Sequence, residues 1–404
     1  MLEPQEARQR CDTADTVVSS ATSPMHDRGV DDMHIPPRPS SLTGISVSTY
    51  LVILPRLCAA LVLGALLCPA ASAQRTLPTL TIYAIDVEGG QSTLVVTPRG
   101  ESLLIDTGFP GDGTFASKPG NPLTARDAQR ILAVTRDAGV KRIDYLLITH
   151  FHGDHDGGVT ELAQLLPIRT FIDHSAPAPE TETGVPGTLA LYDAYRAVRA
   201  MGKHIESKAG DRLPLKGMDA VVVSSEGKLL DKPLRGGGGA GKRCDGNGVP
   251  AQEKLENPRS TGVMLTFGAF RFLDVGDLSG SALFALTCPV NQLGQADVYL
   301  VAHHGGADAG DPAMYASLQP LVALINNGPS KGGQPETFTT LATFPAIDVW
   351  QLHRTVNPAV INMPDARVAN PDTSTSAWIK ISATADGAFT VTNGRTGESR
   401  AYKR

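Results

Sequence analysis

The chain has 404 residues, of which 41% are hydrophobic and 19% are charged, a composition typical of a soluble globular protein with one or two domains. Its formal net charge of -5 at pH 7 provides no general attraction for a polyanion, which argues against a dedicated nucleic-acid-binding protein. A local basic groove is compatible with an acidic total, so nucleic acid stays open as a substrate.

The first 73 residues resemble a leader rather than part of a folded domain. Residues 1–50 are rich in Pro, Ser, Thr, Asp and Arg and predict a disordered leader. Residues 51–73 carry an apolar run and end in Ala71-Ser72-Ala73, the cleavage pattern of a secretory signal peptide. The alternative is a retained membrane anchor, although a Pro-Arg pair interrupts the run. We expect a mature domain at 74–404, located in the periplasm or secreted, with no stable membrane insertion after cleavage.

Cleavage would leave two of the five cysteines, Cys244 and Cys288. In an oxidising compartment two cysteines can pair, but their spacing alone does not decide whether these two meet. Cys244 lies in a low-complexity, glycine-rich segment at 236–257, which we expect to be a flexible loop rather than a domain boundary.

The first half of the mature chain predicts a β-meander followed by alternating helices and strands. Strands are expected at 80–87, 92–97, 102–105, 143–148 and 168–172, and helices at 125–138, from 159 onward and at 192–201. The helix at 125–138 has its apolar residues at helical spacing and stops at Gly139.

The second half repeats this mixture of strands and helices. Its strands are expected at 263–267, 271–275, 296–302, 321–325, 378–383 and 388–392. Two β-meanders, each mixed with helices, predict an α+β fold in which two mixed sheets pack face to face with helices outside.

The strand at 143–148 ends in the densest group of polar side chains in the chain, His150, His152, Asp154 and His155. Residues two apart on an extended segment point to the same side, so His150 and His152 can share one metal ion. Asp154 and His155 follow in a turn and can face a neighbouring position. Imidazole and carboxylate ligands suit zinc, manganese or iron better than calcium or magnesium. A chance surface turn is the alternative that this order disfavours.

Further polar residues follow other apolar strands, as in a loop-built site on a rigid scaffold: Asp106, Asp277, His303 and His304. Beside a histidine cluster, Asp106 is suited to orient the imidazole of a metal ligand. Asn327 and Lys331 follow the strand at 321–325, where a lysine could hold a phosphate or carboxylate of the substrate, or could simply be solvated. His353 is either an inward-facing strand residue or part of a substrate-binding wall.

Four segments together resemble the motifs of the metallo-β-lactamase fold superfamily: Asp106-Thr107-Gly108, His150-x-His152-x-Asp154-His155, Gly276-Asp277 and His303-His304-Gly305. With Asp86-Val87-Glu88-Gly89-Gly90 at its start, the chain is most similar to the hydrolase branch related to the competence protein ComEC. The phosphorylcholine esterases of this fold have a similar double-histidine motif. The resemblance covers about 80–402 and implies an αββα sandwich with a dinuclear centre, of zinc or manganese, at one edge of the sheets.

The resemblance also implies roles for single residues. His150 and His152 would bind the first metal, Asp154 and His155 the second, and Asp277 would bridge both. One of His303 and His304 would complete the second site, and the other would contact the substrate or donate a proton.

The third histidine of the first metal site, which many members carry in a Gly-His-Thr segment, has no counterpart in this sequence. His174, at the end of the predicted strand at 168–172, is the nearest substitute. An ordinary hydrogen-bonded histidine at a strand end is the equal alternative.

Two cations a few ångströms apart lower the pKa of a water between them and stabilise charge on the attacked centre. Asp154 could accept the proton of that water as general base. We therefore expect a metal-dependent hydrolase, first of a phosphodiester and alternatively of a lactam, lactone or thioester. The hypothesis from another class is a non-catalytic metal-binding scaffold of the same fold.

Overall fold

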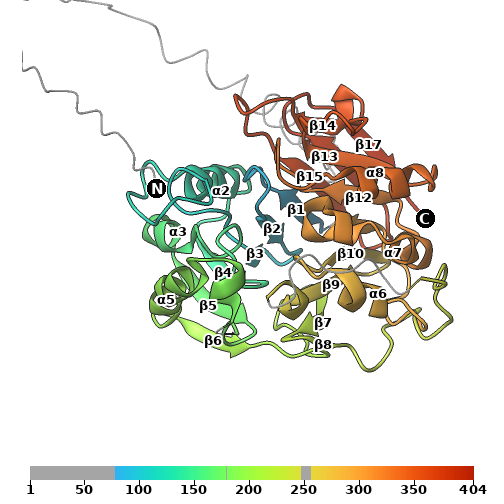
Figure 1. Ribbon diagram of the computed structural model, residues 1–404, viewed down its shortest axis with the longest axis horizontal. Helices are drawn as coiled ribbons and strands as arrows, with labels where there is room; N and C mark the ends of the chain where they lie inside the picture. Colours follow the sequence, from blue (N-terminus) through green and yellow to red (C-terminus); the bar gives the residue numbers. More distant parts are fainter. Residues whose placement is uncertain (1–77, 179, 247–255) are drawn as a thin grey trace, which may run out of the picture. The chain divides into compact units, whose positions relative to one another are not determined.

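A computed structural model of the protein describes residues 78–178, 180–246 and 256–404 (Figure 1). The predicted leader and signal peptide lie outside the described residues, as does part of the predicted glycine-rich loop. Arg75–Arg404 form one compact unit. Among the described residues, none of the helices has the length and apolar character needed to span a membrane.

The first sheet has the strand order β17-β16-β15-β1-β2-β3-β4-β5-β6. Its strands are β1 (Leu80–Ala84), β2 (Thr93–Val96), β3 (Ser102–Ile105), β4 (Ile143–Leu147), β5 (Ile168–Asp173), β6 (Lys203–Glu206), β15 (Ile379–Ala383), β16 (Phe389–Asn393) and β17 (Ser399–Tyr402). The pairs from β3 to β6 are parallel, and the others are antiparallel.

The second sheet has the order β14-β13-β12-β11-β10-β9-β7-β8. Its strands are β7 (Asp219–Ser225), β8 (Lys228–Leu229), β9 (Gly262–Phe267), β10 (Phe270–Asp274), β11 (Val298–Leu300), β12 (Val322–Ile325), β13 (Asp348–His353) and β14 (Val368–Asn370). The pairs from β10 to β14 are parallel, and those among β7, β8, β9 and β10 are antiparallel.

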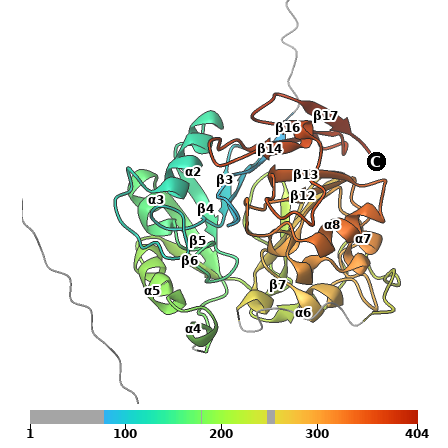
Figure 2. The same cartoon turned by 45° about the horizontal axis from the view of Figure 1, so that its top comes forward.

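Helices cover the outer face of each sheet (Figure 2). The first sheet carries α2 (Arg126–Asp137), α3 (Val159–Leu165) and α5 (Thr188–Arg199), and the second carries α6 (Gly280–Ala285), α7 (Pro312–Leu318) and α8 (Pro335–Ala342). The core between the sheets combines inward-facing residues of both, such as Ile82, Leu265 and Trp350. The predicted αββα sandwich of two mixed sheets is confirmed.

The parallel strands explain why the polar motifs can meet. Carboxyl ends of parallel strands open at the same edge of a sheet, which is where sites form in such sheets. Asp106 and His150 follow β3 and β4 in the first sheet, and Asp277 and His303 follow β10 and β11 in the second. Packing the two sheets face to face therefore brings the two sets of motifs together.

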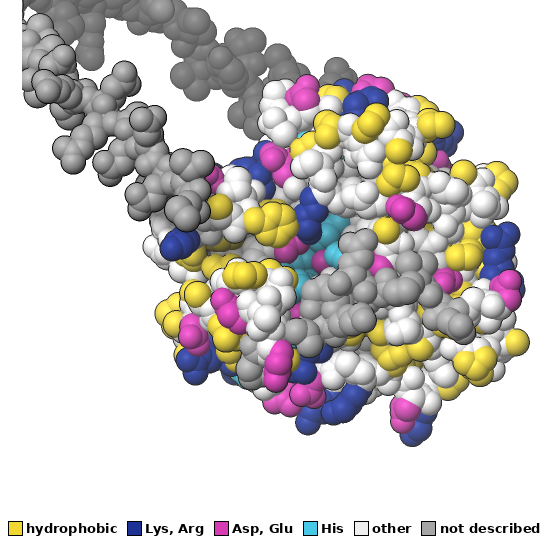
Figure 3. Space-filling model, in the orientation of Figure 1, with side chains coloured by type: hydrophobic (Ala, Val, Ile, Leu, Met, Phe, Trp, Pro, Cys, Tyr) yellow, Lys and Arg dark blue, Asp and Glu magenta, His cyan; other side chains and the backbone are white. Residues whose placement is uncertain are grey.

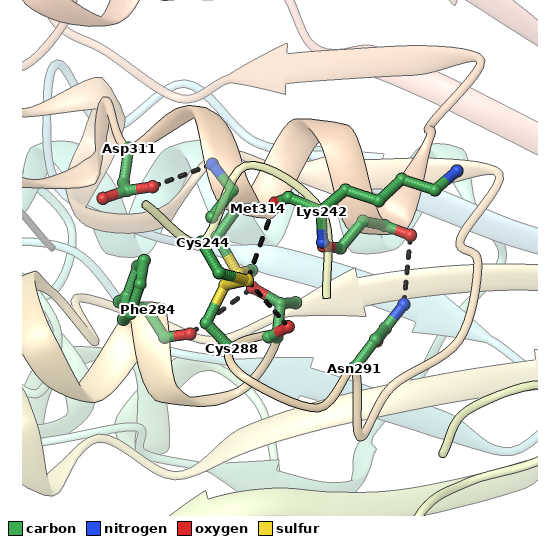
Figure 4. Close-up of a disulfide and its surroundings, with 10 residues drawn as sticks. Lys242, Cys244, Phe284, Cys288, Asn291, Asp311 and Met314 are labelled. Carbon is green, nitrogen blue, oxygen red and sulfur yellow. Dashed lines mark hydrogen bonds between the residues drawn. A yellow bond between two sulfur atoms is a disulfide. The ribbon is translucent and has the colours of Figure 1, made fainter. Parts of the chain in front are cut away.

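Cys244 and Cys288 form a disulfide (Figure 4). The segment before it is also tied down by the backbone, because Gly238 N–H donates to Asn291 O and Gly241 N–H donates to Pro289 O. The described part of the glycine-rich segment is thus fastened to the turn after α6.

Candidate metal centre

Four buried side chains, Asp154, His155, Asp277 and His304, place one potential ligand atom each within 4.8 Å of one another. His155 Nε2 lies 3.3 Å from Asp154 Oδ2 and 3.3 Å from Asp277 Oδ2. His304 Nε2 lies 3.3 Å from Asp154 Oδ2 and 3.1 Å from Asp277 Oδ1. Tetrahedral coordination with bonds of about 2.1 Å separates ligand atoms by about 3.4 Å, so these four groups fit one zinc-like ion.

A second group of nitrogens lies more loosely around Asp277, on the Oδ2 atom that His155 also approaches. His150 Nε2 lies 3.0 Å from His152 Nδ1 and 3.9 Å from Asp277 Oδ2. His303 Nε2 lies 3.7 Å from the same Asp277 oxygen. Asp277 Oδ1 faces His304, while Oδ2 faces His155 of the first group as well as His150 and His303 of the second. The carboxylate thus lies between the two groups, which is the placement a bridging carboxylate requires. Figure 3 shows histidine side chains in a hollow of the surface, with acidic groups beside them.

Asp106 lies directly behind His155. Its Oδ2 accepts from His155 Nδ1 at 2.7 Å, while Thr149 donates to Asp106 through both its backbone N–H and its hydroxyl at 2.7 Å. A carboxylate on Nδ1 fixes the imidazole tautomer and leaves Nε2 available to a metal ion. This is the orienting position that the sequence predicts for Asp106.

His303 has an equivalent partner that the sequence analysis missed. Its Nδ1 lies 2.7 Å from Asp308 Oδ1, and Asn257 Nδ2 lies 3.3 Å from its Nε2. His303 and His304 both have left-handed backbone angles, with φ of 49° and 54°, which L-residues adopt only where the surroundings hold them. Asp308, which follows the double histidine closely, was the sequence signal for the first of these contacts. Asn257 follows a low-complexity loop, and no pattern in the sequence indicated its contact with His303.

The structure places His174 beside Glu256 rather than beside Asp277. His174 Nε2 lies 3.0 Å from Glu256 Oε1, and its ring packs on Phe151. Glu256 Oε1 also accepts from the Phe151 backbone N–H, so this pair lies under the peptide between His150 and His152. Its position suits support of the loop better than metal ligation.

Of the three predicted substrate-binding residues, only Lys331 contacts the cluster. Its Nζ donates to Gly89 O at 2.7 Å and contacts Asp154 Oδ2. Asn327 is buried and donates to the backbone oxygen of His353. His353 Nε2 lies 2.9 Å from Asp86 Oδ1.

The charges around His353 are already balanced. Asp86, Glu88 and His353 are close enough to be a second group of ligands, but Arg130 pairs with both carboxylates and Arg126 pairs with Glu88. Two guanidinium groups supply the positive charge that a cation would bring, so we assign no metal ion there.

The electrostatics of the main cluster favour a divalent cation. Burial lowers the pKa of His155, but the carboxylates of Asp277, Asp154 and Asp106 outweigh it and raise this pKa well above its usual value. Burial likewise raises the pKa of Asp277, but three imidazoles outweigh it and hold this pKa well below its usual value. The cluster thus keeps its carboxylates anionic and draws positive charge to itself, as a metal site does.

Metal binding is expected to release protons at pH 7. The carboxylates that raise the pKa of His155 favour its protonated form, and a metal ion must displace that proton. The apparent affinity should therefore increase with pH until His155 is neutral. Calorimetric titration with zinc in buffers of different ionisation enthalpy should give a net release of about one proton or more per chain. A binding enthalpy independent of the buffer would contradict this expectation.

The third imidazole of the first metal site is expected to be His303 and not His174. His303→Asn should lower the metal content from about two ions per chain to about one. Loss of a residue that only orients a ligand weakens metal affinity by about 10- to 100-fold, and loss of the ligand itself should weaken it at least as much. His174→Asn should retain both ions. Elemental analysis after dialysis distinguishes the two, and loss of an ion only in His174→Asn would reverse the assignment.

Part of the chain is similar to known proteins. Residues 85–241 match the sequence model of the metallo-beta-lactamase superfamily. A hydroxyacylglutathione hydrolase from Alkalilimnicola ehrlichii is 39% identical over 69 residues, which are 17% of this chain and 25% of the relative. The chain thus matches about a quarter of the length of that relative.

Two solved structures are similar over most of their own length. The metallo-beta-lactamase fold protein YhfI from Bacillus subtilis has a TM-score of 0.40 and 12% identity, covering 68% of this chain and 96% of that chain. A diphosphatase from the PhnP family has a TM-score of 0.35 and 13% identity, covering 67% of this chain and 94% of that chain.

Proposed function

We propose that this chain, which has the metallo-β-lactamase superfamily fold, is a dinuclear metal-dependent hydrolase whose substrate is a phosphodiester. The observation that carries the proposal is the placement of Asp277, whose carboxylate lies between His155 and His304 on one side and His150 and His303 on the other. A non-catalytic scaffold would have no need for two groups of imidazoles around one buried carboxylate.

In this proposal His150, His152 and His303 hold one ion, Asp154, His155 and His304 hold the other, and Asp277 bridges them. Nitrogen and carboxylate donors suit zinc, with manganese as the alternative. When bound, the two ions supply Lewis acidity and acidify a water molecule.

The residues of the chain then bind and orient the substrate. The Nζ of Lys331, beside Asp154, is placed to pair with an anionic oxygen of the diester. In the reaction the water oxygen bonds to phosphorus, one P–O ester bond breaks, and an alcohol and a phosphomonoester result. Asp154 is our candidate for accepting the proton of the attacking water.

The local similarity to a hydroxyacylglutathione hydrolase supports a second candidate, hydrolysis of a thioester or related acyl compound. The same cluster can serve either reaction, because both need a Lewis acid and an activated water. Lys331 favours the phosphodiester, since a cation beside the metal ligands suits an anionic reacting group. With the phosphodiester substrate we also propose that the chain is related to the ComEC-like branch of the superfamily.

We also propose that the protein acts in the periplasm or outside the cell. The Cys244–Cys288 disulfide supports an oxidising compartment, and the predicted signal peptide supports export. Mass spectrometry of the mature N-terminus tests this, with Gln74 as the expected first residue.

The proposed function is tested by metal analysis and turnover on one sample. The zinc- or manganese-loaded protein should contain about two ions per chain and hydrolyse bis(p-nitrophenyl) phosphate. Two ions with turnover only of thioesters, lactones or lactams would move the substrate to the second candidate. Protein that retains no metal after incubation with either ion would contradict the metal-dependent hydrolase and favour a non-catalytic role of the same fold.

Lys331→Met should lower kcat/KM for the phosphodiester by about tenfold, since a hydrogen bond to a charged group contributes about 1.5–3 kcal/mol. Lys228→Met, at an exposed lysine of β8, is the matched control and should leave kcat/KM unchanged. Steady-state kinetics at low and high salt provide the measurement. An equal effect of both substitutions would remove Lys331 from the substrate site.

A further inference from the structure

Two buried polar side chains link the two sheets close to the metal centre. Gln91 lies between β1 and β2 of the first sheet, and Asp274 is the last residue of β10 in the second. Both residues are almost completely buried. Gln91 Nε2 lies 3.0 Å from Asp274 Oδ1, to which it donates, and 3.3 Å from Oδ2. This contact fastens one sheet to the other.

The backbone of Gln91 contacts both segments that hold metal ligands of the first sheet in place. Its N–H donates to Asp154 O at 3.0 Å, and its carbonyl accepts from Gly108 N–H at 3.0 Å. Gly108 follows two residues after Asp106, the carboxylate that orients His155. Gln91 therefore fixes the backbone beside one ligand and beside the partner of another.

Asp274 makes the corresponding contact in the second sheet. Its Oδ1 accepts from Gly276 N–H at 3.0 Å, and Gly276 directly precedes Asp277. A methyl group at Gly276 would come within 2.8 Å of Thr149 Cβ, so this turn packs closely against the segment that precedes His150. The bond from Gly276 therefore fixes the turn from which Asp277 reaches the histidines of the first sheet.

Asn326, at the end of β12, holds the Gln91 amide in one orientation. Its Nδ2 donates to Gln91 Oε1 at 3.2 Å, so the oxygen of this amide is occupied and its nitrogen points toward Asp274. A buried carboxylate is costly unless it is hydrogen-bonded, and the bonds that Asp274 accepts come from uncharged N–H groups. Stability alone would require such donors, but not their connection to the ligand segments of both sheets.

We infer that Gln91 and Asp274 are positioning residues that hold Asp154 and Asp277 at the separation that one metal ion requires. These two ligands come from different sheets, and metal–ligand distances are kept to within about 0.2 Å. A looser contact between the sheets would therefore weaken coordination. The inference rests on the metal centre of the proposed function and is independent of which bond is hydrolysed.

Gln91→Glu tests this role, because it keeps the shape of the side chain but places a second carboxylate against Asp274. Burial raises the pKa of Asp274 to about 7, so titrations at pH 8 keep this carboxyl mainly anionic. Zinc affinity of the full protein, measured by competition with a chromophoric chelator, should fall by about 10- to 100-fold, as for other residues that orient ligands.

The double variant Gln91→Glu/Asp274→Asn reverses donor and acceptor without changing the net charge. The new amide can donate to the new carboxylate and still accept from Gly276 N–H, so zinc affinity should return to within about threefold of the wild type. Gln91→Met, which removes both amide contacts without adding a charge, should show the same loss as Gln91→Glu and replaces it should that variant not fold.

Gln351→Glu is the matched control. Gln351 is equally buried on β13, and its amide nitrogen donates to Asn362 Oδ1, so the same exchange is made away from the metal ligands. Its zinc affinity should equal that of the wild type. Urea unfolding of each metal-free protein accompanies the titrations, because a merely structural bond lowers the free energy of unfolding but leaves the zinc affinity of the folded protein unchanged.

The failures of the two proposals are distinguishable. Unchanged zinc affinity in folded Gln91→Glu, an equal loss in Gln351→Glu, or a loss that the double variant does not restore overturns the positioning role even when diesters are hydrolysed. A restored loss in a protein that hydrolyses no diester supports the positioning role and overturns only the phosphodiester reaction. A wild type that binds no zinc overturns both.

Discussion

Asp277→Asn should lose most of its bound metal and reduce turnover by at least about a thousandfold. The substitution keeps the size of the side chain but removes the charge that faces both sets of imidazoles. A bridging carboxylate neutralises part of the charge of two adjacent cations, and an amide cannot replace it. Since hydrolysis depends on both ions, a loss of several kcal/mol in transition-state stabilisation is expected.

Elemental analysis and kinetics on the same preparation check this prediction. Asp386→Asn, at an exposed aspartate paired with Lys403, is the matched control and should keep both metal and turnover. Because Asp277 is buried, thermal unfolding of the metal-free proteins should be compared first to show that the variant is folded. A folded Asp277→Asn protein with two ions per chain would contradict the bridging role.

Cys244→Ser should destabilise the protein by about 4 kcal/mol. The disulfide joins residues 44 positions apart, and closing a loop of this length restricts the unfolded chain by about that amount. Cys244 is the suitable position because it is only partly buried, whereas Cys288 is buried and its replacement would also disturb packing. Urea unfolding of wild type and variant gives the difference in free energy of unfolding.

Reduction provides an independent check of the same bond. A phosphine reductant should lower the stability of the wild type to that of Cys244→Ser and leave the variant unchanged. The segment after Cys244 leads to Glu256 and Asn257 at the metal centre, so reduction should also lower turnover at temperatures where the folded state survives. Equal stability of wild type and variant would show that the bond does not restrain the chain.

Much of the fold was predictable because apolar strands with clear boundaries signal themselves locally. The strands that became β1, β3, β4, β9, β10, β12, β15 and β16 were expected within a few residues of their observed bounds. β6, β7, β8, β14 and β17 were missed. β6 and β17 are largely exposed edge strands with no apolar alternation to detect, so their pairing depends on a neighbouring strand and not on their own pattern. β7 is buried, and its apolar run at 220–223 was a signal that the sequence offered.

The disulfide and the role of His353 needed the tertiary structure. Two cysteines 44 residues apart can pair only if the chain between them returns, which depends on the contacts of the glycine-rich segment with the turn after α6. His353 lies on a strand, β13, which is one of the two alternatives that the sequence left open, and its partner Asp86 comes from the other end of the domain.

The sequence by itself determined the αββα class and the residue types of the centre, because strand periodicity and the order of the motifs are local properties. Only the tertiary structure decided which histidine faces which ligand. His174 and His303 are equivalent in sequence, each following an apolar strand. The left-handed backbone at His303 and the Asp308 carboxylate turn its Nε2 toward Asp277, while Glu256 lies against His174. Side-chain direction depends on partners that are distant in the chain, so it is established only when the two sheets pack together.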